Sequence, residues 1–400
     1  MLTPSRPRLV CLAATLVLLL TTVATAQHDP GGVTGGGMIG GSTERSSKPA
    51  TKPANKPSST STVPKRKTTP AAPKRPTTTS PTVSADAYYQ QGETLYKEQK
   101  YREALELYIK ATQINPSMSA ALYRIGWIYN DLEDYESAID PLKRVIAMQP
   151  TYAAAHFELG YSYRKLERFN EALPLFQETV RLKPDYAAAH YEIGWIYNEQ
   201  KNYTAAIDSL KSALSYRNAY ADAQAELGYA YRHLNRTPEA IQAYQEAIRL
   251  KPDKGLAYLG LADVYFSNTK QYAEAAKTYK QGLQYSPNNA TARYNLAWCY
   301  NDLERYTEAV DELREAIRLR PTYPEAYNEM GYALHQLNRF GEAVQQYQVA
   351  IRQKANYASA HFNLGMSFIA LNNRNAALEQ YRILQRIDSA RATKLFNHLK

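Results

Sequence analysis

The sequence predicts an all-α protein, built as a solenoid of antiparallel helix pairs. Three series of small or rigid residues predict it, because the members of each series recur at intervals of about 34 residues. The first series is Gly92, Gly126, Gly160, Gly194, Gly228, Ala262, Ala297, Gly331 and Gly365. The second is Ala104, Ala138, Ala172, Ala206, Ala240, Ala275, Ala309, Ala343 and Ala377. The third is Pro116, Pro150, Pro184, Pro252, Pro287 and Pro321. These series divide residues 85–391 into nine repeats.

Residues 1–26 have the pattern of a secretory signal peptide. Arg6 and Arg8 precede the apolar run "LVCLAATLVLLL" (9–20), and "ATA" (24–26) provides small residues before a cleavage that would leave Gln27 first. The apolar run is shorter than the ~20 residues that span a bilayer. We therefore expect a secreted or periplasmic protein, with an uncleaved N-terminal anchor as the alternative.

Residues 27–84 are predicted to be a disordered linker rich in Gly, Pro, Thr and Lys. The stretch 46–81 lacks aromatic residues and cannot bury enough apolar surface to offset its ordering entropy. Nine Lys or Arg residues against two acids lie in 27–84, so most of the net charge of +10 is here and the remainder is nearly neutral. A nucleic-acid-binding body would carry a concentrated basic face, so no nucleic-acid partner is expected. The linker is either a solvated spacer or a basic tether to anionic envelope polymer or lipid.

The repeat 153–186 shows how each unit folds. "AAAHFELGYSYRKL" places Phe157, Gly160 and Arg164 at helical spacing, and "NEALPLFQETVRL" forms a second helix. Gly160 and Ala172 are small because the two helices cross closely there. The residue after each proline is predicted to cap the next helix: Ser117, Thr151, Asp185, Asp253, Asn288 and Thr322. One repeat is a residue longer, and we expect the extra residue in the turn 266–272. Residues 389–400 can form a last helix, and 392–400 are expected to cap the stack.

The 34-residue period with this Gly, Ala and Pro pattern resembles the tetratricopeptide repeat. The resemblance covers most of the chain, and Asn218 and Ala355 depart from it where a proline would end the repeat. It implies a right-handed superhelical solenoid whose first helices line a concave face. Some members of this family hold a peptide carboxylate with Lys and Asn at the fifth and ninth positions of a repeat. Those positions are mostly aromatic in this chain, so that clamp is not expected.

Motifs for catalysis or cofactors are not found. The sequence has no phosphate-binding loop, no dinucleotide-binding glycine pattern, no His-Glu-x-x-His motif and no Gly-x-Ser-x-Gly elbow. His156, His190 and His361 share the fourth position of their repeats, where they are expected to pack rather than to bind metal. Cys299 is expected to be a packing residue. We therefore predict that the protein is not an enzyme and uses no cofactor.

Aromatic residues dominate the fifth and ninth positions, which the resemblance places on the concave face. Large rigid rings are typical of interface hot spots, although these rings could also pack between neighbouring first helices. The predicted partner-binding residues, which include the twelfth position, are Tyr123, Trp127, Asn130, Phe157, Tyr161, Arg164, Tyr191, Trp195, Asn198, Tyr229, Arg232, Tyr294, Trp298 and Asn301.

The twelfth and thirteenth positions alternate between two types. They read Asn130-Asp131, Arg164-Lys165, Asn198-Glu199, Arg232-His233, Asn301-Asp302 and His335-Gln336. In one interpretation Asn holds the backbone of an extended peptide and Arg holds its acidic groups. In the other, Asp131 pairs with Arg164, and Glu199 pairs with Arg232 or Arg164, across neighbouring helices.

We therefore predict a protein-protein interaction scaffold of the cell envelope, which binds an extended peptide or partner protein in an aromatic groove. One alternative is a glycan or cell-wall binding protein that uses the aromatic rings and the basic linker. Another is an accessory subunit that recruits a separate enzyme. No membrane span is expected once the signal peptide has been removed.

Overall fold

The computed structural model of the chain describes residues 83–400. The predictions made for the signal peptide and for nearly all of the linker lie outside the described residues. Residues 83–168 and 169–400 form two compact units, here called the N-terminal and the C-terminal unit. Between residues 83 and 400 the chain forms helices and no strands, which confirms the all-α prediction.

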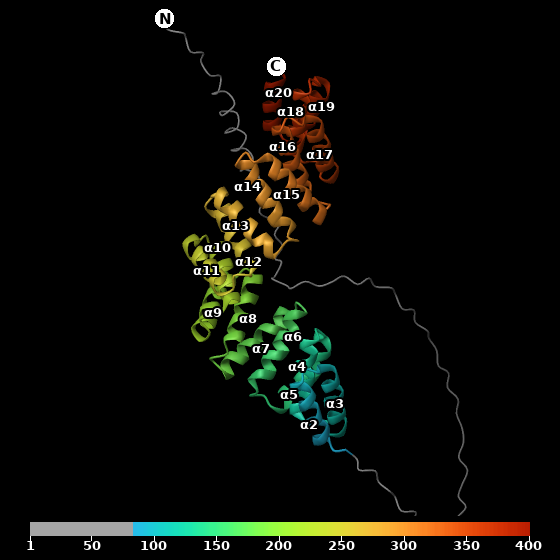
Figure 1. The fold of residues 1–400 in the computed structure, drawn as a ribbon, viewed down its shortest axis with the longest axis vertical. Helices are drawn as coiled ribbons and strands as arrows, with labels where there is room; N and C mark the ends of the chain where they lie inside the picture. Colours follow the sequence, from blue (N-terminus) through green and yellow to red (C-terminus); the bar gives the residue numbers. More distant parts are fainter. Residues whose placement is uncertain (1–82) are drawn as a thin grey trace, which may run out of the picture. The chain divides into compact units, whose positions relative to one another are not determined.

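Helices follow one another in antiparallel pairs within each unit (Figure 1). The first helices of the repeats are α2 (Ala85–Lys97), α4 (Ser119–Asp131), α6 (Ala153–Lys165), α8 (Ala187–Glu199), α10 (Ala221–His233), α12 (Gly255–Asp263), α14 (Ala290–Asp302), α16 (Pro324–Gln336) and α18 (Ala358–Ala370). The second helices are α3 (Tyr101–Ile114), α5 (Tyr135–Met148), α7 (Phe169–Leu182), α9 (Tyr203–Tyr216), α11 (Thr237–Leu250), α13 (Tyr272–Tyr285), α15 (Tyr306–Leu319), α17 (Phe340–Gln353) and α19 (Arg374–Ile387). The last helix is α20 (Ser389–Leu399).

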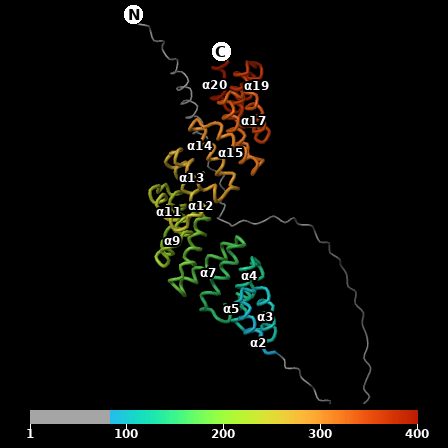
Figure 2. The backbone as a smooth tube through the Cα atoms, viewed as in Figure 1, coloured from blue at the N-terminus to red at the C-terminus, as the bar shows by residue number. Residues whose placement is uncertain are grey.

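The turn after each first helix contains one residue in the left-handed backbone conformation. At the end of α4 this residue is Glu133, with φ of 60°, and the amide of Asp134 donates to the carbonyl of Tyr129 at 2.8 Å. The bond closes the helix end and reverses the chain, as the tube in Figure 2 shows at successive helix ends. The same conformation occurs at Gln99, Glu167, Lys201, Asn235, Lys270, Glu304, Asn338 and Asn372.

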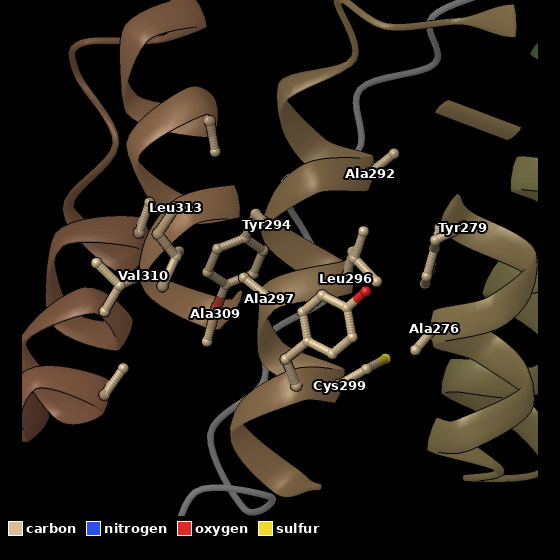
Figure 3. Close-up of a cluster of buried hydrophobic side chains, with 14 of the residues drawn as sticks. Ala276, Tyr279, Ala292, Tyr294, Leu296, Ala297, Cys299, Ala309, Val310 and Leu313 are labelled. Atoms are coloured by element: carbon tan, nitrogen blue, oxygen red, sulfur yellow. The ribbon is translucent and has the colours of Figure 1, made fainter. Parts of the chain in front are cut away.

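Small residues allow close crossing inside the repeats. A Cβ added at Gly126 of α4 would lie 2.4 Å from Cγ of Leu142 on α5, so glycine is required by packing there. In the C-terminal unit, α13, α14 and α15 bury Tyr279, Cys299 and Leu313 in one apolar cluster (Figure 3). Burial raises the pKa of the Cys299 thiol well above its usual range, which suits the predicted packing role.

The extra residue of the sixth repeat does not lie in a loop, so its predicted place in the turn 266–272 is wrong. Helix α12 continues after Asp263 as a π-helix, Val264–Asn268. The amide of Thr269 donates to the carbonyl of Val264 at 3.2 Å, which is the wider spacing of a π-helix. The wider turn takes up one residue, and Phe266 and Val264 still reach the core.

The predicted capping residues of the first helices are one position too early. The N-cap residues are Met118, Tyr152, Tyr186, Lys254, Asn289 and Tyr323. Of these, Asn289 caps with its side chain, which accepts a hydrogen bond from the amide of Ala292. At the C-terminal end, α20 buries Leu395 and Leu399, and Leu395 packs beneath Gly365 of α18. Helix α20 thereby covers the apolar side of the last repeat.

Candidate interaction face

The first-helix face is defined here by positions 5, 9, 12 and 13 of the first helices. At position 5, tyrosine rings pack on the tyrosine that ends the same repeat. Tyr191 lies 5.0 Å from Tyr220 between ring centroids, and the same contact joins Tyr123 to Tyr152 at 5.1 Å. Tyr294, which is buried, makes the contact at 5.0 Å with Tyr323. Burial holds the pKa of Tyr191 and of Tyr294 well above the usual range, so both hydroxyls stay neutral.

At position 9, each aromatic ring packs against an aromatic ring of the preceding second helix. Trp127 lies 5.5 Å from Tyr101, and Trp298 lies 4.9 Å from Tyr272, both nearly edge to face. The same contact joins Tyr161 to Tyr135, Trp195 to Phe169, Tyr229 to Tyr203 and Tyr332 to Tyr306. These contacts join each ring to the preceding second helix. The predicted packing between neighbouring first helices is found at Trp127, which lies 5.2 Å from Tyr96, and at Trp298, which lies 5.1 Å from Phe266.

The packed rings differ in exposure. Trp195 retains 8 % of its surface, whereas Trp127, Tyr161, Tyr229 and Trp298 are half-buried and keep part of the ring accessible. Phe157 is also half-buried and stacks on Tyr161 at 6.5 Å. The three tryptophans of the chain all occupy position 9. Their fluorescence would therefore report on this face alone.

At position 12, the asparagines bind the next first helix. Nδ2 of Asn130 donates to the backbone carbonyl of Glu158 at 3.0 Å and to its Oε2 at 2.9 Å. Asn198 makes the same two bonds to Glu226, and Asn301 makes them to Glu329, always across 28 residues of sequence. All three asparagines are buried. Their amide groups therefore hold neighbouring repeats together, and the expectation that they face a peptide backbone is corrected.

The glutamates that receive these bonds lie in weakly solvated sites. Burial raises the pKa of Glu158, Glu226 and Glu329 from 4.5 to about 7, and the asparagine hydrogen bond opposes this only in part. Each of the three carboxyl groups therefore titrates near neutrality. These glutamates, at position 6, were not among the predicted residues. The sequence does contain a pattern that identifies them, because every asparagine at position 12 is followed by a glutamate 28 residues later.

The arginines at position 12 are held within the solenoid as well. Nη1 of Arg232 pairs with Oδ2 of Asp263 at 3.2 Å, on the next first helix. In the N-terminal unit, the guanidinium of Arg164 lies 5.0 Å from the centre of the Tyr161 ring. The predicted pair of Asp131 with Arg164 is not formed, and Asp131 is exposed. Arg232 takes Asp263 as its ion-pair partner and not Glu199, while the alternative pairing of Glu199 with Arg164 stays a prediction.

The aromatic ladder is interrupted where α10 meets α12. Position 5 of α10 is Ala225, and position 9 of α12 is Asp263, so neither is aromatic. At Asp263, hydrogen-bonded polar groups take the place of the ring contact. Asp263 accepts from the hydroxyl of Tyr279 at 2.5 Å, and that hydroxyl accepts from Nδ2 of Asn295 at 3.1 Å. The interruption coincides with the π-helix. A similar acid at position 9, Glu93, accepts from Tyr108 at 2.6 Å and pairs with Arg124 at 2.7 Å.

A small hollow lies on this face between α16 and α18. It has a volume of about 30 Å³ and is lined by Tyr332, His335, Gln336, Tyr347, Phe362, Asn363 and Met366. In the last repeat position 9 is Met366 and not an aromatic residue, so the ladder ends at the hollow. The space is about that of one water molecule or methyl group.

The histidines at position 4 have a structural role. Nε2 of His156 lies 2.8 Å from the carbonyl oxygen of Pro150, and His190 and His361 make the same bond to Pro184 and Ala355. Because a carbonyl only accepts, each Nε2 carries the hydrogen. The predicted packing role is confirmed, with the addition of this bond across the inter-repeat turn. Within residues 83–400, no group of His, Cys, Asp and Glu side chains could hold a metal ion.

Comparisons with known proteins agree with the repeat structure. A family model described as Tetratricopeptide repeat matches residues 157–221 and 259–324, and another of that description matches 83–151. A model described as TPR repeat matches 228–268 and 331–372, so the three models together span more than half of the chain. No curated protein matches the sequence. None of the helices described between residues 83 and 400 is long and apolar enough to cross a membrane.

Three solved structures illustrate the similarity in fold. YrrB, described as a TPR protein with an unusual peptide-binding site, is 23% identical, with 48% of this chain and 99% of that chain covered and a TM-score of 0.45. The pilF protein of Pseudomonas aeruginosa is 19% identical, with coverages of 54% and 97% and a TM-score of 0.46. The APC/C hetero-tetramer Cut9–Hcn1 gives 17% identity, coverages of 71% and 56%, and a TM-score of 0.48.

Proposed function

The chain belongs to the tetratricopeptide repeat family, and on that premise we propose that it is a non-catalytic scaffold that binds an extended peptide or partner protein on its first-helix face. The family supports the general function of a protein-interaction scaffold. The choice of face and the kind of partner are the specific part of the proposal. Within the described residues, nearly all of the chain is used to build repeats.

The row of half-buried rings at position 9 carries the proposal. Trp127, Tyr161, Tyr229 and Trp298 are each fixed by a lateral ring contact and still expose part of their surface. A ring that is already immobilised loses little rotamer freedom when a partner binds, so more of its contact energy appears as affinity. Aromatic side chains of this kind are the usual hot spots of protein interfaces.

Charged side chains at position 13 border the ring row and would select among partners. Asp131 and Asp302 are exposed, whereas Nζ of Lys165 lies over the rings of Tyr135 and Tyr161 at 5.5 and 5.6 Å. His233 is stacked 4.7 Å from Tyr203, and burial with the nearby Arg232 lowers its pKa to about 4. Position 13 therefore carries an exposed carboxylate on some repeats and, on others, a basic or imidazole side chain that lies against a tyrosine ring. Exposed carboxylates beside partly exposed rings favour partners that carry positively charged side chains next to apolar ones.

Selection from a random peptide display library, followed by tryptophan fluorescence, tests the proposal. Peptides that bind this face should change the emission of Trp127 or Trp298, since all three tryptophans lie on it. The double variant Trp127→Leu/Trp298→Leu, with one change in each unit, should lose at least about tenfold in affinity for peptides that bind either unit, because each unit loses a hot-spot ring. Tyr216→Ala/Tyr285→Ala is the control, because these rings are about half exposed and lie at the ends of second helices. Equal binding by the folded leucine variant and the wild type would refute the proposal.

The envelope location is a separate part of the proposal and rests on the sequence of residues 1–26. Expression of the full chain with a C-terminal tag, followed by N-terminal sequencing of the exported product, tests it. We expect the mature chain to begin at Gln27. A product that keeps Met1 and remains inside the cell would refute the location and leave the binding proposal standing.

A further inference from the structure

The buried contact between Asn198 of α8 and Glu226 of α10 is incomplete. Nδ2 of Asn198 donates to Oε2 of Glu226 at 2.9 Å, but Oδ1 of the same amide is buried and has no hydrogen-bond partner. Asn301 repeats this arrangement in the same unit, with Nδ2 at 3.3 Å from Oε2 of Glu329 and an equally buried, unpartnered Oδ1. Both junctions therefore lack one hydrogen-bond donor, which is costly because the acceptor is buried.

The third copy of the contact shows what the other two lack. Oδ1 of Asn130 accepts from the hydroxyl of Ser162 at 2.7 Å, and Ser162 is fully buried. The residues that correspond to Ser162 are Ala230 beside Asn198 and Ala333 beside Asn301. An alanine methyl cannot donate. The two junctions of the C-terminal unit therefore have a polar gap that the serine fills in the N-terminal unit.

We propose that Glu226 and Glu329 act as protonation-dependent latches between neighbouring first helices. A neutral carboxyl group has one O–H donor, and this donor can satisfy the orphaned Oδ1 while the other oxygen continues to accept from Nδ2. Amide and acid then form a two-way pair. An ionised carboxylate has no O–H donor, so only the hydrogen bond from Nδ2 to the carboxylate remains. The negative charge is then left in a buried site. The latch closes in mildly acidic medium and loosens in mildly alkaline medium.

The groups around the two carboxyls support this direction. The ionisable neighbours of Glu226 are Tyr191 and Glu199 on α8, Asp222 and Tyr229 on α10, Tyr244 on α11, and Lys254 before α12. Glu199 and Asp222 disfavour ionisation, and Lys254, which favours it, is already paired with Asp222. For Glu329 the ionisable neighbours are Tyr294, Tyr332, Tyr347 and Tyr357, all with a pKa raised far above neutrality. Oε1 of Glu329 also accepts from Nδ2 of Asn328 at 3.2 Å, which opposes the effect of burial in part. Burial places the pKa of both glutamates at about 7, within the range where a latch can respond.

This inference does not depend on the binding partner, because it concerns the stacking of α10 on α8 and of α16 on α14 in the unbound chain. Its consequence for the first-helix face is direct. Asn198 and Asn301 occupy position 12, and the rings of position 9 lie one turn earlier on the same helices. A loosened latch would increase motion in the face that we propose binds a partner.

Hydrogen exchange of the full chain at about pH 5.5 and at about pH 8, corrected for the intrinsic pH dependence of exchange, tests the latch. We expect protection of α10 and α16 to fall about tenfold or more at the higher pH, as a buried ionised group would require. Glu226→Gln/Glu329→Gln should keep both latches closed at both pH values, because a glutamine amide donates and accepts at once. Helix α12 has Gly260 at the corresponding position and serves as an internal control.

Two outcomes would overturn the inference. One is equal protection of α10 and α16 at both pH values in the wild type. The other is the same loss of protection in the wild type and the glutamine variant. Should the glutamine variant not fold, Ala230→Ser is measured instead. Its hydroxyl supplies a donor to Oδ1 of Asn198 at any pH, so protection of α10 should fall by less than in the wild type, although the buried charge of Glu226 remains. A loss at α10 that is unchanged in Ala230→Ser would also overturn the inference.

Discussion

The amide nitrogen of Asn198 donates to two atoms of one residue, the carbonyl oxygen of Glu226 at 3.1 Å and its Oε2 at 2.9 Å. A single side chain therefore fixes both the position and the rotation of the next first helix. Asn130 and Asn301 do the same for Glu158 and Glu329. The alternation of Asn and Arg at position 12 is thus a property of inter-repeat stacking.

Replacement of Asn198 by alanine should destabilise the C-terminal unit. The change removes two hydrogen bonds and leaves the buried Glu226 carboxyl without its amide donor, which costs about 2–3 kcal/mol. Urea unfolding followed by circular dichroism measures the effect. Asn288→Ala, at an exposed position, is the control and should change little. Equal midpoints for both variants would contradict the clamp role of Asn198.

Ala230→Ser should stabilise the same junction, since it reproduces the donor that Ser162 provides to Asn130. The gain is expected to be about 1 kcal/mol, which is the value of a satisfied acceptor less the poorer helix propensity of serine. The reverse change, Ser162→Ala, should cost a similar amount in the N-terminal unit. Thermal unfolding of both variants provides the comparison. A loss of stability with Ala230→Ser would show that the space at Ala230 cannot hold a hydroxyl.

Much of this architecture could be predicted from the sequence, because helix pairing depends on residues that repeat. Gly126 and Ala138 indicated a close crossing, and the structure places Leu142 against that glycine. The place of the inserted residue could not be predicted. A helix can absorb one residue by widening a turn, and the repeat pattern does not distinguish a loop from a π-helix that keeps Phe266 against Trp298.

The candidate site was predicted in its residue types and less well in their orientation. Within each unit the position-9 ring packs as one aromatic contact per repeat, Trp127 on Tyr101 and Trp298 on Tyr272. Asn198 occupies the predicted position on its helix, but the next helix covers it, since the rotation between neighbouring first helices is not determined by a single repeat. For the same reason, the partner of Arg232 is Asp263 of the following repeat.

Gly331→Ala and Gly341→Ala, in one repeat, should have opposite effects. A Cβ at Gly331 would lie 2.6 Å from Cε1 of the buried Tyr347, so a loss of about 1–3 kcal/mol is expected from overpacking. Nothing lies within 4 Å of a Cβ at Gly341, an exposed helical position. Alanine there should stabilise by about 0.5–1 kcal/mol, because the unfolded chain loses freedom. Calorimetric melting temperatures that move in the same direction would contradict the packing difference between the two glycines.

Glu304→Asn should stabilise the turn after α14. Glu304 adopts φ of 58°, a conformation that costs most residues about 1–2 kcal/mol and that asparagine tolerates. The corresponding residues of the next two repeats are Asn338 and Asn372, so the chain already uses asparagine in this geometry. We expect a gain of about 0.5–1 kcal/mol in urea unfolding. Asn338→Glu, the reverse change, should lose as much, and a gain from it would refute the explanation.

Glu158→Gln should make the N-terminal unit more stable at alkaline pH and less sensitive to pH. Burial raises the pKa of Glu158 from 4.5 to about 7, so the folded chain binds more protons than the unfolded chain between these two values. Stability therefore falls as the pH rises through this window, and the loss is complete above about pH 7, at no more than about 3 kcal/mol. Glutamine carries no charge and can still accept from Asn130. Unfolding free energies measured from about pH 5 to about pH 8.5 should fall for the wild type and stay nearly level for Glu158→Gln. Parallel curves for the two proteins would show that another group controls the pH dependence. Glu133→Gln, at an exposed turn position, is the control for the removal of one surface charge.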